Sequence, residues 1–279
     1  MIRTESLKKT YQDGTEALSG ITVRLEKRFT SIIGRNGAGK TTFIRILSTQ
    51  LMPSSGEAYL DGIDLIGNPE KARREIVSIP QESAPIGILT PFELIKMYLV
   101  ARGFSFKEAH DQAIATLDTL DLREYRDKPS DTLSGGTKRK VFVCMALASN
   151  ASTVFLDEPT TGLDPLSRLE VWSALKVLQG NVILTTHYME EAKELSNEVL
   201  LIDSGKVIDQ GTVDSLLSRF KGLVRAESLV PKPDTMRIGG LYIRYIKYSE
   251  AQDYISQGFD IKAITLDDVF IKHGVTLES

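Results

Sequence analysis

One glycine-rich run, residues 34–42, limits the possible folds of this chain more than any other stretch. The run reads GRNGAGKTT and fits the pattern G-x-x-x-x-G-K-[ST]. Residues 28–33 before it are apolar and β-branched, which predicts a buried strand. Residues 41–47 after it place their apolar side chains on one helical face, which predicts a helix. A glycine loop between a strand and a helix predicts a phosphate-binding site.

The residue types in this loop suit a bound polyphosphate. Gly34, Gly37 and Gly39 let the backbone turn tightly, so that successive N–H groups can point at phosphate oxygens. The Lys40 ammonium is expected on the β- and γ-phosphates, and the Thr41 hydroxyl can ligate Mg²⁺. The alternative is a glycine-rich turn without a ligand, and the strand–loop–helix context argues against it.

Bulk properties narrow the class of protein. The length of 279 residues suits one large domain, or one domain with an appendage, and 42% hydrophobic content suits a globular protein. The net charge of −3 gives no overall basic footprint, so no nucleic acid partner is expected. The single cysteine, Cys144, excludes an internal disulfide and fits a reducing cytoplasm. No signal peptide is visible, and the apolar runs fall far short of the ~20 residues needed to span a bilayer.

The secondary-structure signals change along the chain. Residues 2–33 predict strands, with turns at 12–14 and 19–20. Residues 88–150 predict helices, two of which open with capping boxes at Thr90 and Ser105. Further strands are predicted at the runs 76–79, 153–157, 182–186, 198–203 and 206–210. A linker is predicted over residues 220–232, followed by a strand at 241–246 and a helix at 266–272.

The predicted strand 153–157 ends in two acids, Asp157 and Glu158. Successive side chains of a strand point to opposite faces, so these carboxylates are expected to diverge. The first can hold Mg²⁺, and the second can accept a proton from a water that attacks a phosphate. A solvated turn explains two acids at a strand end equally well.

Several other residues carry weaker signals when they are taken singly. Ser134, Gly135 and Gly136 can form a capped helix start with bare N–H groups for an anion, although an ordinary capped helix is the simpler explanation. His187 follows a predicted strand and could contact a phosphate, but a lone histidine is more often structural. Gln81 could sense Mg²⁺ or water, and Tyr11 could stack on a base.

In their order along the chain these residues resemble the nucleotide-binding subunit of ABC transporters, over nearly all of residues 1–220. The family motifs that match are the aromatic Tyr11, the Walker A loop, the Q-loop Gln81, the signature 133–137, the Walker B acids, the D-loop 162–164 and the switch residue His187. The resemblance implies an α/β fold with a P-loop NTPase core. It also implies a mostly parallel sheet, an N-terminal antiparallel β subdomain, a helical insertion and a small C-terminal α+β appendage. The expected domains are 1–220, with a helical subdomain at about 88–150, and 221–279.

The resemblance further implies an ATPase that uses ATP and Mg²⁺ and works at the cytoplasmic face of a membrane. Its expected partners are a separate membrane-spanning permease and a second nucleotide-binding subunit, either the same chain or a homologue, paired head to tail. Hydrolysis would involve Glu158, His187 and Gln81, and Mg²⁺ would lie at Thr41, Gln81 and Asp157. The residues implied to bind nucleotide are Tyr11, Gly34, Arg35, Asn36, Gly37, Ala38, Gly39, Lys40, Thr41, Thr42, Ser134, Gly135, Gly136 and Asp164.

Three features are similar to the drug-export branch of the family. Residues 138–140 are basic, residues 185–192 read TTHYMEEA, and residues 265–270 read TLDDVF. The basic trio is equally explained as a solvated helix face. Thr137 departs from the commoner signature, which ends in Gln, but Ser134, Gly135 and Gly136 are intact. The alternatives are a soluble ABC-type ATPase acting on ribosomes or DNA, and a binding-only regulatory module. The transported molecule is not encoded in this chain.

Overall fold

A six-stranded, mostly parallel sheet forms the centre of the computed structural model, which describes residues 1–273. Its strand order is β10-β9-β3-β8-β7-β6, and only β10, at the edge, runs antiparallel to its neighbour. The strands are β3 (Phe29–Ile33), β6 (Ile76–Ile79), β7 (Thr153–Asp157), β8 (Asn181–Thr186), β9 (Glu198–Asp203) and β10 (Lys206–Gly211). The carboxyl ends of β3, β7 and β8 therefore meet at one edge, where a ligand site is expected.

A second, antiparallel sheet precedes the core in the sequence. Its strand order is β2-β1-β4-β5, built from β1 (Ile2–Thr10), β2 (Glu16–Leu25), β4 (Ser55–Leu60) and β5 (Ile63–Asp64). The turn predicted at residues 12–14 joins β1 to β2, but the one predicted at residues 19–20 is wrong. Gly20 lies inside β2 with a φ of +95°, where the register with β1 shifts in a β-bulge.

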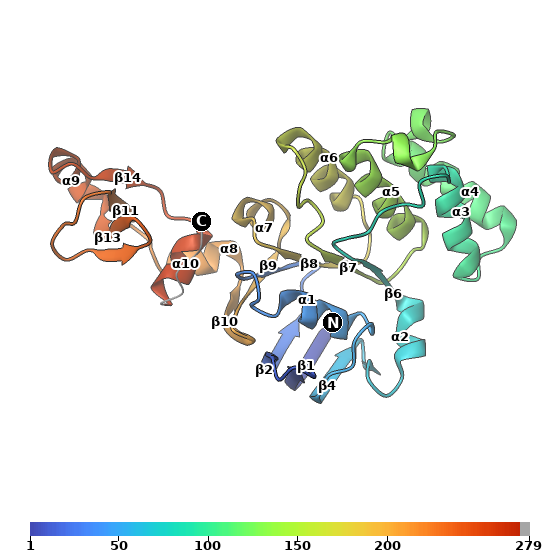
Figure 1. The fold of residues 1–279 in the computed structure, drawn as a ribbon, viewed down its shortest axis with the longest axis horizontal. Coiled ribbons are helices and arrows are strands. Elements are labelled where there is room, and N and C mark those ends of the chain that lie inside the picture. The colour runs from blue at the N-terminus through green and yellow to red at the C-terminus, as the bar shows by residue number, and fades with distance from the viewer. Residues whose placement is uncertain (274–279) are drawn as a thin grey trace.

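The two faces of the core sheet bury different partners. Val154 and Leu156 of β7 pack into one hydrophobic cluster with the helices of residues 88–178. Phe155, between them, packs into a second cluster with helix α1 (Lys40–Leu47) and the N-terminal sheet. In Figure 1 the core sheet accordingly lies between α1 and the N-terminal sheet on one side and α5 and α6 on the other. Burial on both faces explains why these strands are continuous apolar runs.

Helices dominate the stretch predicted to be helical. They are α3 (Pro91–Ala101), α4 (Phe106–Thr119) and α5 (Gly135–Ala148), with short 3₁₀ turns at Arg123–Tyr125 and Ser130–Thr132. Both predicted capping boxes are confirmed, since the Thr90 and Ser105 side chains each accept from an N3 backbone N–H at 3.2 Å. The connections between the core strands use α2 (Pro69–Glu75), α6 (Pro165–Lys176) and α7 (Met189–Leu195).

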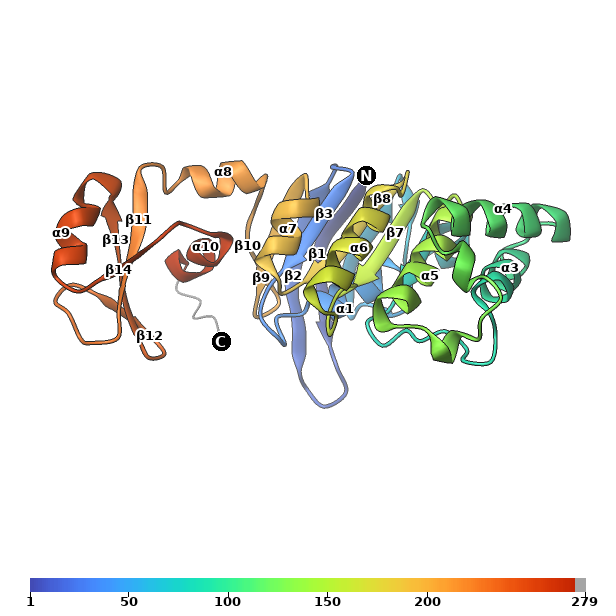
Figure 2. The same ribbon diagram turned by 90° about the horizontal axis from the view of Figure 1, so that it is seen from above.

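The C-terminal part forms a third sheet at the opposite end of the long axis from α3 and α4 (Figure 2). Its elements are α8 (Val213–Ser218), β11 (Leu223–Ser228), β12 (Met236–Ile238), β13 (Leu241–Lys247), α9 (Ala251–Ser256), β14 (Asp260–Lys262) and α10 (Leu266–Lys272). The linker predicted over residues 220–232 is wrong, because β11 pairs with both β13 and β14.

Helix α10 ties this part back to the core. Leu266, Val269 and Phe270 share a hydrophobic cluster with Ile33 of β3 and Val199 of β9. The predicted α/β fold, with its antiparallel N-terminal sheet, mostly parallel core sheet, helical region and C-terminal sheet, is confirmed. The division of the chain at residue 220 stays a prediction, and the last six residues of the predicted appendage, 274–279, lie outside the described residues.

Candidate active site

A hollow of about 560 Å³ opens beside the glycine loop at the carboxyl edge of the core sheet. It is polar on one side, where charged groups from the loop and from the ends of β7 and β8 converge. The residues that line it are Tyr11, Thr15, Ala17, Asn36, Gly37, Gly39, Lys40, Thr41, Thr42, Gln81, Glu158, Thr161 and His187. Of the predicted site residues, the hollow therefore collects Tyr11, most of the glycine loop, and Gln81, Glu158 and His187 from the ends of β6, β7 and β8.

The loop conformation requires glycine at two positions. Gly37 and Gly39 have φ values of +78° and +102°, a region that L-residues with side chains rarely adopt. A Cβ on Gly39 would lie 2.4 Å from the Ala17 carbonyl oxygen, whereas one on Gly37 would meet nothing within 4 Å. The chain thus turns sharply against β2 before α1 begins at Lys40, and open space remains at Gly37 for a ligand.

Lys40 is buried although it carries a charge, with a side chain only 5% exposed. Its Nζ donates to the carbonyl oxygens of Gly34 at 2.8 Å and Arg35 at 3.1 Å, and lies 3.7 Å from Glu158 Oε1. Burial lowers the pKa of Lys40, and the nearby carboxylates of Glu158 and Asp157 oppose that shift. The ammonium is thus held inside the loop, at the edge of the hollow.

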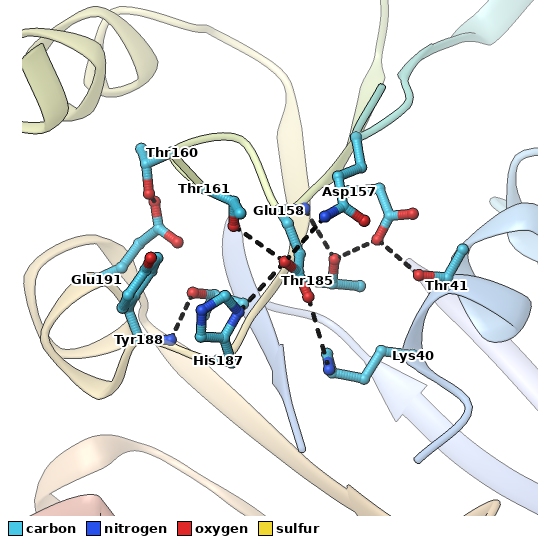
Figure 3. A network of polar contacts seen from close by, with 12 residues as sticks. Lys40, Thr41, Asp157, Glu158, Thr160, Thr161, Thr185, His187, Tyr188 and Glu191 are labelled. Atoms are coloured by element: carbon cyan, nitrogen blue, oxygen red, sulfur yellow. Dashed lines mark hydrogen bonds and ion pairs between the residues drawn. The ribbon is translucent and has the colours of Figure 1, made fainter. Parts of the chain in front are cut away.

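Asp157 and Glu158 diverge as their position at a strand end predicts (Figure 3). Asp157 Oδ1 accepts from the Thr41 hydroxyl at 3.1 Å and from the Thr185 hydroxyl at 2.5 Å. Glu158 has a φ of +48°, and its N–H donates to the Thr185 carbonyl and hydroxyl oxygens. The left-handed backbone at Glu158 turns its side chain away from that of Asp157, so the two acids have separate sets of partners.

The Glu158 carboxylate lies at the centre of a polar cluster. It accepts from the Thr161 hydroxyl at 2.9 Å and from the Gln81 amide at 3.4 Å. His187 Nδ1 lies 3.2 Å from Glu158 Oε2. Three separate chain segments therefore place a base candidate, an amide and an imidazole in one hollow. Such an arrangement can orient a water and accept its proton.

The donor set around Asp157 fits Mg²⁺. Within residues 1–273, no three His, Cys, Asp or Glu side chains are arranged to hold a metal by themselves. The predicted ligands Thr41, Asp157 and Gln81 instead offer a hydroxyl, one carboxylate and an amide, and Thr41 already contacts Asp157. Mg²⁺ characteristically binds through one or two carboxylates, substrate phosphates and several waters rather than an all-protein cage. These residues therefore suit a metal that arrives with a nucleotide.

The predicted signature residues do not line this hollow. Ser134 caps α5, accepting from Thr137 N at 3.1 Å and sharing a 2.8 Å hydrogen bond with the Thr137 hydroxyl. Gly136 is packed so closely that a Cβ there would lie 2.8 Å from Ser167 Cβ. Asp164 caps α6, accepting from Leu166 N and Ser167 N at 3.1 Å each. In this single chain Ser134, Gly135, Gly136 and Asp164 therefore form helix starts outside the hollow.

The helix that Ser134 opens is nevertheless connected to Gln81. The Arg139 guanidinium of α5 donates to the Gln81 carbonyl oxygen and lies 3.5 Å from that of Pro80. Burial lowers the pKa of Arg139. The explanation of residues 138–140 as a solvated helix face is therefore wrong for Arg139, because its head group is tied to the segment after β6.

Four residues of the site were not predicted from the sequence. Thr161 and Thr185 hold Glu158 and Asp157 in place, and Thr15 and Ala17 form part of the wall. A hydroxyl next to a predicted site residue is a detectable but common signal. Tyr11, which was predicted, lines the hollow and shares a 3.0 Å hydrogen bond with Thr42. The predicted Gly34, Arg35, Ala38 and Asp157 are not among the residues that line the hollow.

Comparisons with known proteins agree with this geometry. Residues 18–161 match the family model described as ABC transporter. The daunorubicin/doxorubicin resistance ATP-binding protein DrrA of Streptomyces peucetius is 37% identical over 221 residues, covering 78% of this chain and 67% of that protein. ATP-binding cassette sub-family A member 7 of Rattus norvegicus is 38% identical over 192 residues, covering 68% of this chain and 9% of that protein.

Solved structures share the fold. One is a dimeric ATP-binding cassette in a post-hydrolysis state, bound to ADP and Pi, with a TM-score of 0.68 and 27% identity; the match covers 76% of this chain and 98% of that one. Another is cbiO1 from Clostridium perfringens, described as part of the ABC transporter complex cbiONQ, with a TM-score of 0.70 and 27% identity over 78% of this chain and 90% of that one.

Proposed function

Since this chain belongs to the ATP-binding cassette family of ABC transporters, we propose that it is the ATP-hydrolysing subunit that powers a membrane exporter. The observation that carries this proposal is the convergence of Lys40, Glu158 and His187 on the hollow beside the glycine loop. Export is supported by the similarity to ATP-binding proteins named for drug resistance.

We assign the following roles in the reaction. The glycine loop and Lys40 bind the phosphates of ATP, and Tyr11 lies where a base could stack. Glu158 accepts the proton of the attacking water, while His187 and Gln81 hold that water against the γ-phosphate. Thr41, Asp157 and Gln81 would hold Mg²⁺, which supplies charge neutralisation at the β- and γ-phosphates.

A second copy, of this chain or of a homologue, completes each site in this proposal. Two glycine motifs suited to phosphate lie in one chain, yet only the loop at 34–42 lines the hollow. Head-to-tail pairing would place Ser134, Gly135 and Gly136 of one subunit over the nucleotide on the other. Asp164 would help to couple the two sites. ATP would then stabilise the dimer because it contacts both halves only when they are closed.

Mixed variants test the pairing. Lys40→Ala lacks the loop ammonium, and Ser134→Phe blocks the signature with a bulky side chain. Each variant alone should fail to dimerise with ATP, but a mixture forms one intact site from the unmodified halves. We therefore expect ATP-dependent association only in the mixture, measured by analytical ultracentrifugation with two fluorophores. Equal behaviour of the mixture and of each variant alone would refute head-to-tail pairing.

The surface proposed for the membrane partner is an apolar groove of about 860 Å³ on the helical region. Phe92, Met97 and Val100 of α3 line it, together with Phe106 at the start of α4. Met97 and Phe106 are 56% and 74% exposed, so with the neighbouring lining residues they form a contiguous apolar surface. No helix within residues 1–273 has the length and apolar character to cross a bilayer. In this proposal a separate permease binds in the groove. A movement of Gln81 would reach the helical region, and so the permease, through the hydrogen bond between Arg139 and the Gln81 carbonyl oxygen.

Purification with native membranes tests the function as a whole. Tagged protein is recovered from gently solubilised membranes, and the chains that co-purify are identified. A stoichiometric multi-span membrane protein supports the proposal, and loss of that protein in Met97→Glu would support the groove. Recovery of ribosomes or DNA-bound protein, with no membrane chain, would overturn it.

In the same proposal residues 1–220 form the ATP-binding domain, with its helical subdomain at about 88–150, and residues 221–279 form an appendage.

A further inference from the structure

One fully buried carboxylate, Glu191, lies outside the hollow and has no part in the roles assigned above. Its side chain is 0% exposed, in the first turn of α7. Its Oε1 accepts from the Thr160 hydroxyl at 2.8 Å (Figure 3). The same oxygen accepts from the Trp172 indole N–H at 2.9 Å. A single oxygen therefore receives donors from two other segments of the chain.

Through its bond to Thr160, Glu191 joins two segments that both belong to the proposed hydrolytic site. Thr160, which is also fully buried, lies between Glu158 and Asp164, in the loop that leaves β7. Glu191 comes four residues after His187, in the helix that follows β8. The Thr160–Glu191 bond thus fixes the segment after the base candidate to the helix after the imidazole.

A stacked set of side chains joins helix α6 to the start of α7. The Arg168 guanidinium of α6 lies 4.1 Å from the centroid of the Tyr188 ring. That ring in turn packs on His187, with centroids 4.1 Å apart and planes inclined by 40°. Helices α6 and α7 are therefore tied together twice just after His187, by Glu191 in the interior and by Tyr188 nearer the surface.

Burying a carboxylate at this position costs free energy. Burial of the Glu191 carboxyl raises its pKa, although the Thr186, Thr160 and Trp172 donors and the charge of Arg168 oppose that shift. Its neighbours Ala192 and Leu195 on α7 are buried and apolar, so an apolar residue would also fit the pattern of this helix. The free-energy cost of burying a carboxylate here is explained if its oxygen is needed as a hydrogen-bond acceptor.

We propose that Glu191 is a positioning residue for ATP hydrolysis, which holds Thr160 so that the segment from Glu158 to Asp164 stays in register with His187. This inference rests on the proposed roles of Glu158 and His187. Because a misplacement of about 1 Å can cost about a hundredfold in rate, loss of the Thr160–Glu191 bond should lower kcat while leaving nucleotide binding intact.

Four variants separate this role from simple packing. Glu191→Gln keeps an acceptor oxygen, whereas Glu191→Leu fills the space without one. Thr160→Val removes only the hydroxyl donor, with nearly the same shape. Trp172→Phe removes the other donor and leaves the Thr160 bond in place. The chain contains one tryptophan, so fluorescence of Trp172 checks packing around Glu191 in the variants that retain it.

The measurement is steady-state phosphate release, with circular dichroism to confirm folding and nucleotide affinity measured by calorimetry. We expect Glu191→Leu and Thr160→Val to lose about tenfold or more in kcat, with KM and affinity within about threefold of the original protein. Glu191→Gln and Trp172→Phe should stay within about threefold in kcat. If Glu191→Leu does not fold, Thr160→Val still decides the question.

Full kcat in folded Thr160→Val would overturn the inference. Glu158→Gln in the same assay separates the two levels of the argument. If Glu158→Gln loses turnover while Thr160→Val and Glu191→Leu do not, only the role of Glu191 fails. If Glu158→Gln retains turnover, the proposed hydrolytic site fails, and the role of Glu191 fails with it.

Discussion

Replacing Glu158 with Gln tests the proposed site most directly, because the change removes one charge and keeps the shape. Glu158 Oε1 lies 3.7 Å from Lys40 Nζ, and the two side chains are 9% and 5% exposed. At that distance the attraction is worth about 4.5 kcal/mol for an effective dielectric constant of about 20. The carboxylate also pays a desolvation cost of several kcal/mol that the amide avoids. We therefore expect the free energy of unfolding to change by only about 1–2 kcal/mol.

The effect on catalysis should be far larger. A general base contributes about 10²–10⁴-fold to the rate, so the barrier should rise by about 3–5 kcal/mol. ATP binding should persist or tighten, because the Lys40 ammonium loses a competing anion while keeping its hydrogen bonds to the Gly34 and Arg35 carbonyl oxygens. The Thr161 hydroxyl can still donate to the Gln amide oxygen, which helps to preserve the local structure.

The assay compares phosphate release, ATP affinity and thermal unfolding in the purified protein. Thr161→Val is the matched control, because it removes a 2.9 Å hydrogen bond to Glu158 without removing the charge. Its loss of turnover should be much smaller than that of Glu158→Gln. Turnover within threefold of the original protein in Glu158→Gln would refute the assignment of the base. A loss of ATP binding would show that Glu158 contributes to binding ATP and not only to the chemical step.

Four further predictions follow from the same contacts. Lys40→Ala should weaken ATP binding by about a hundredfold, about 3 kcal/mol, and calorimetry showing unchanged affinity would remove Lys40 from the phosphate site. Asp157→Asn should raise the Mg²⁺ concentration needed for half-maximal turnover, measured by titration after EDTA treatment. Asp157→Asn should not change the affinity for nucleotide that is measured without Mg²⁺. Burial raises the pKa of Cys144 to about 12, so thiol reagents at pH 8 should label the native protein only as fast as it unfolds. Burial also raises the pKa of Glu191 above its ordinary 4.5, so the ionised carboxylate destabilises the fold increasingly as pH rises past that value. The stability advantage of Glu191→Gln in urea unfolding should therefore grow above pH 4.5 and then level off, and a constant difference would contradict the shift.

Local signals predicted the parts of this structure that depend on neighbouring residues. The capping boxes at Thr90 and Ser105 specify a helix start within four residues, and both are confirmed. The runs 76–79, 153–157 and 198–203 have the bounds of β6, β7 and β9, because a strand buried on both faces is continuously apolar.

Two predictions failed where distant segments decide the conformation. Gly20 gives the signal of a turn, but pairing with β1 keeps it inside β2 as a bulge. Residues 223–228 precede two prolines and read as a linker, yet β13 and β14, both later in the chain, make them a central strand. In both cases the partner strand supplies hydrogen bonds that the local sequence does not announce.

By itself the sequence determined the chemistry available to this protein. A glycine loop ending in Lys40 and Thr41 can bind phosphate wherever a strand and a helix enclose it, because the signal lies in consecutive residues. Only the tertiary structure decided how the remaining groups meet. It gave Glu158 a left-handed backbone, brought Gln81 and His187 to that carboxylate, and left Ser134 outside the hollow. It also buried Glu191 against Thr160 and Trp172. These contacts join residues far apart in the chain, so they depend on how the strands are ordered in the sheet and not on any run of amino acids.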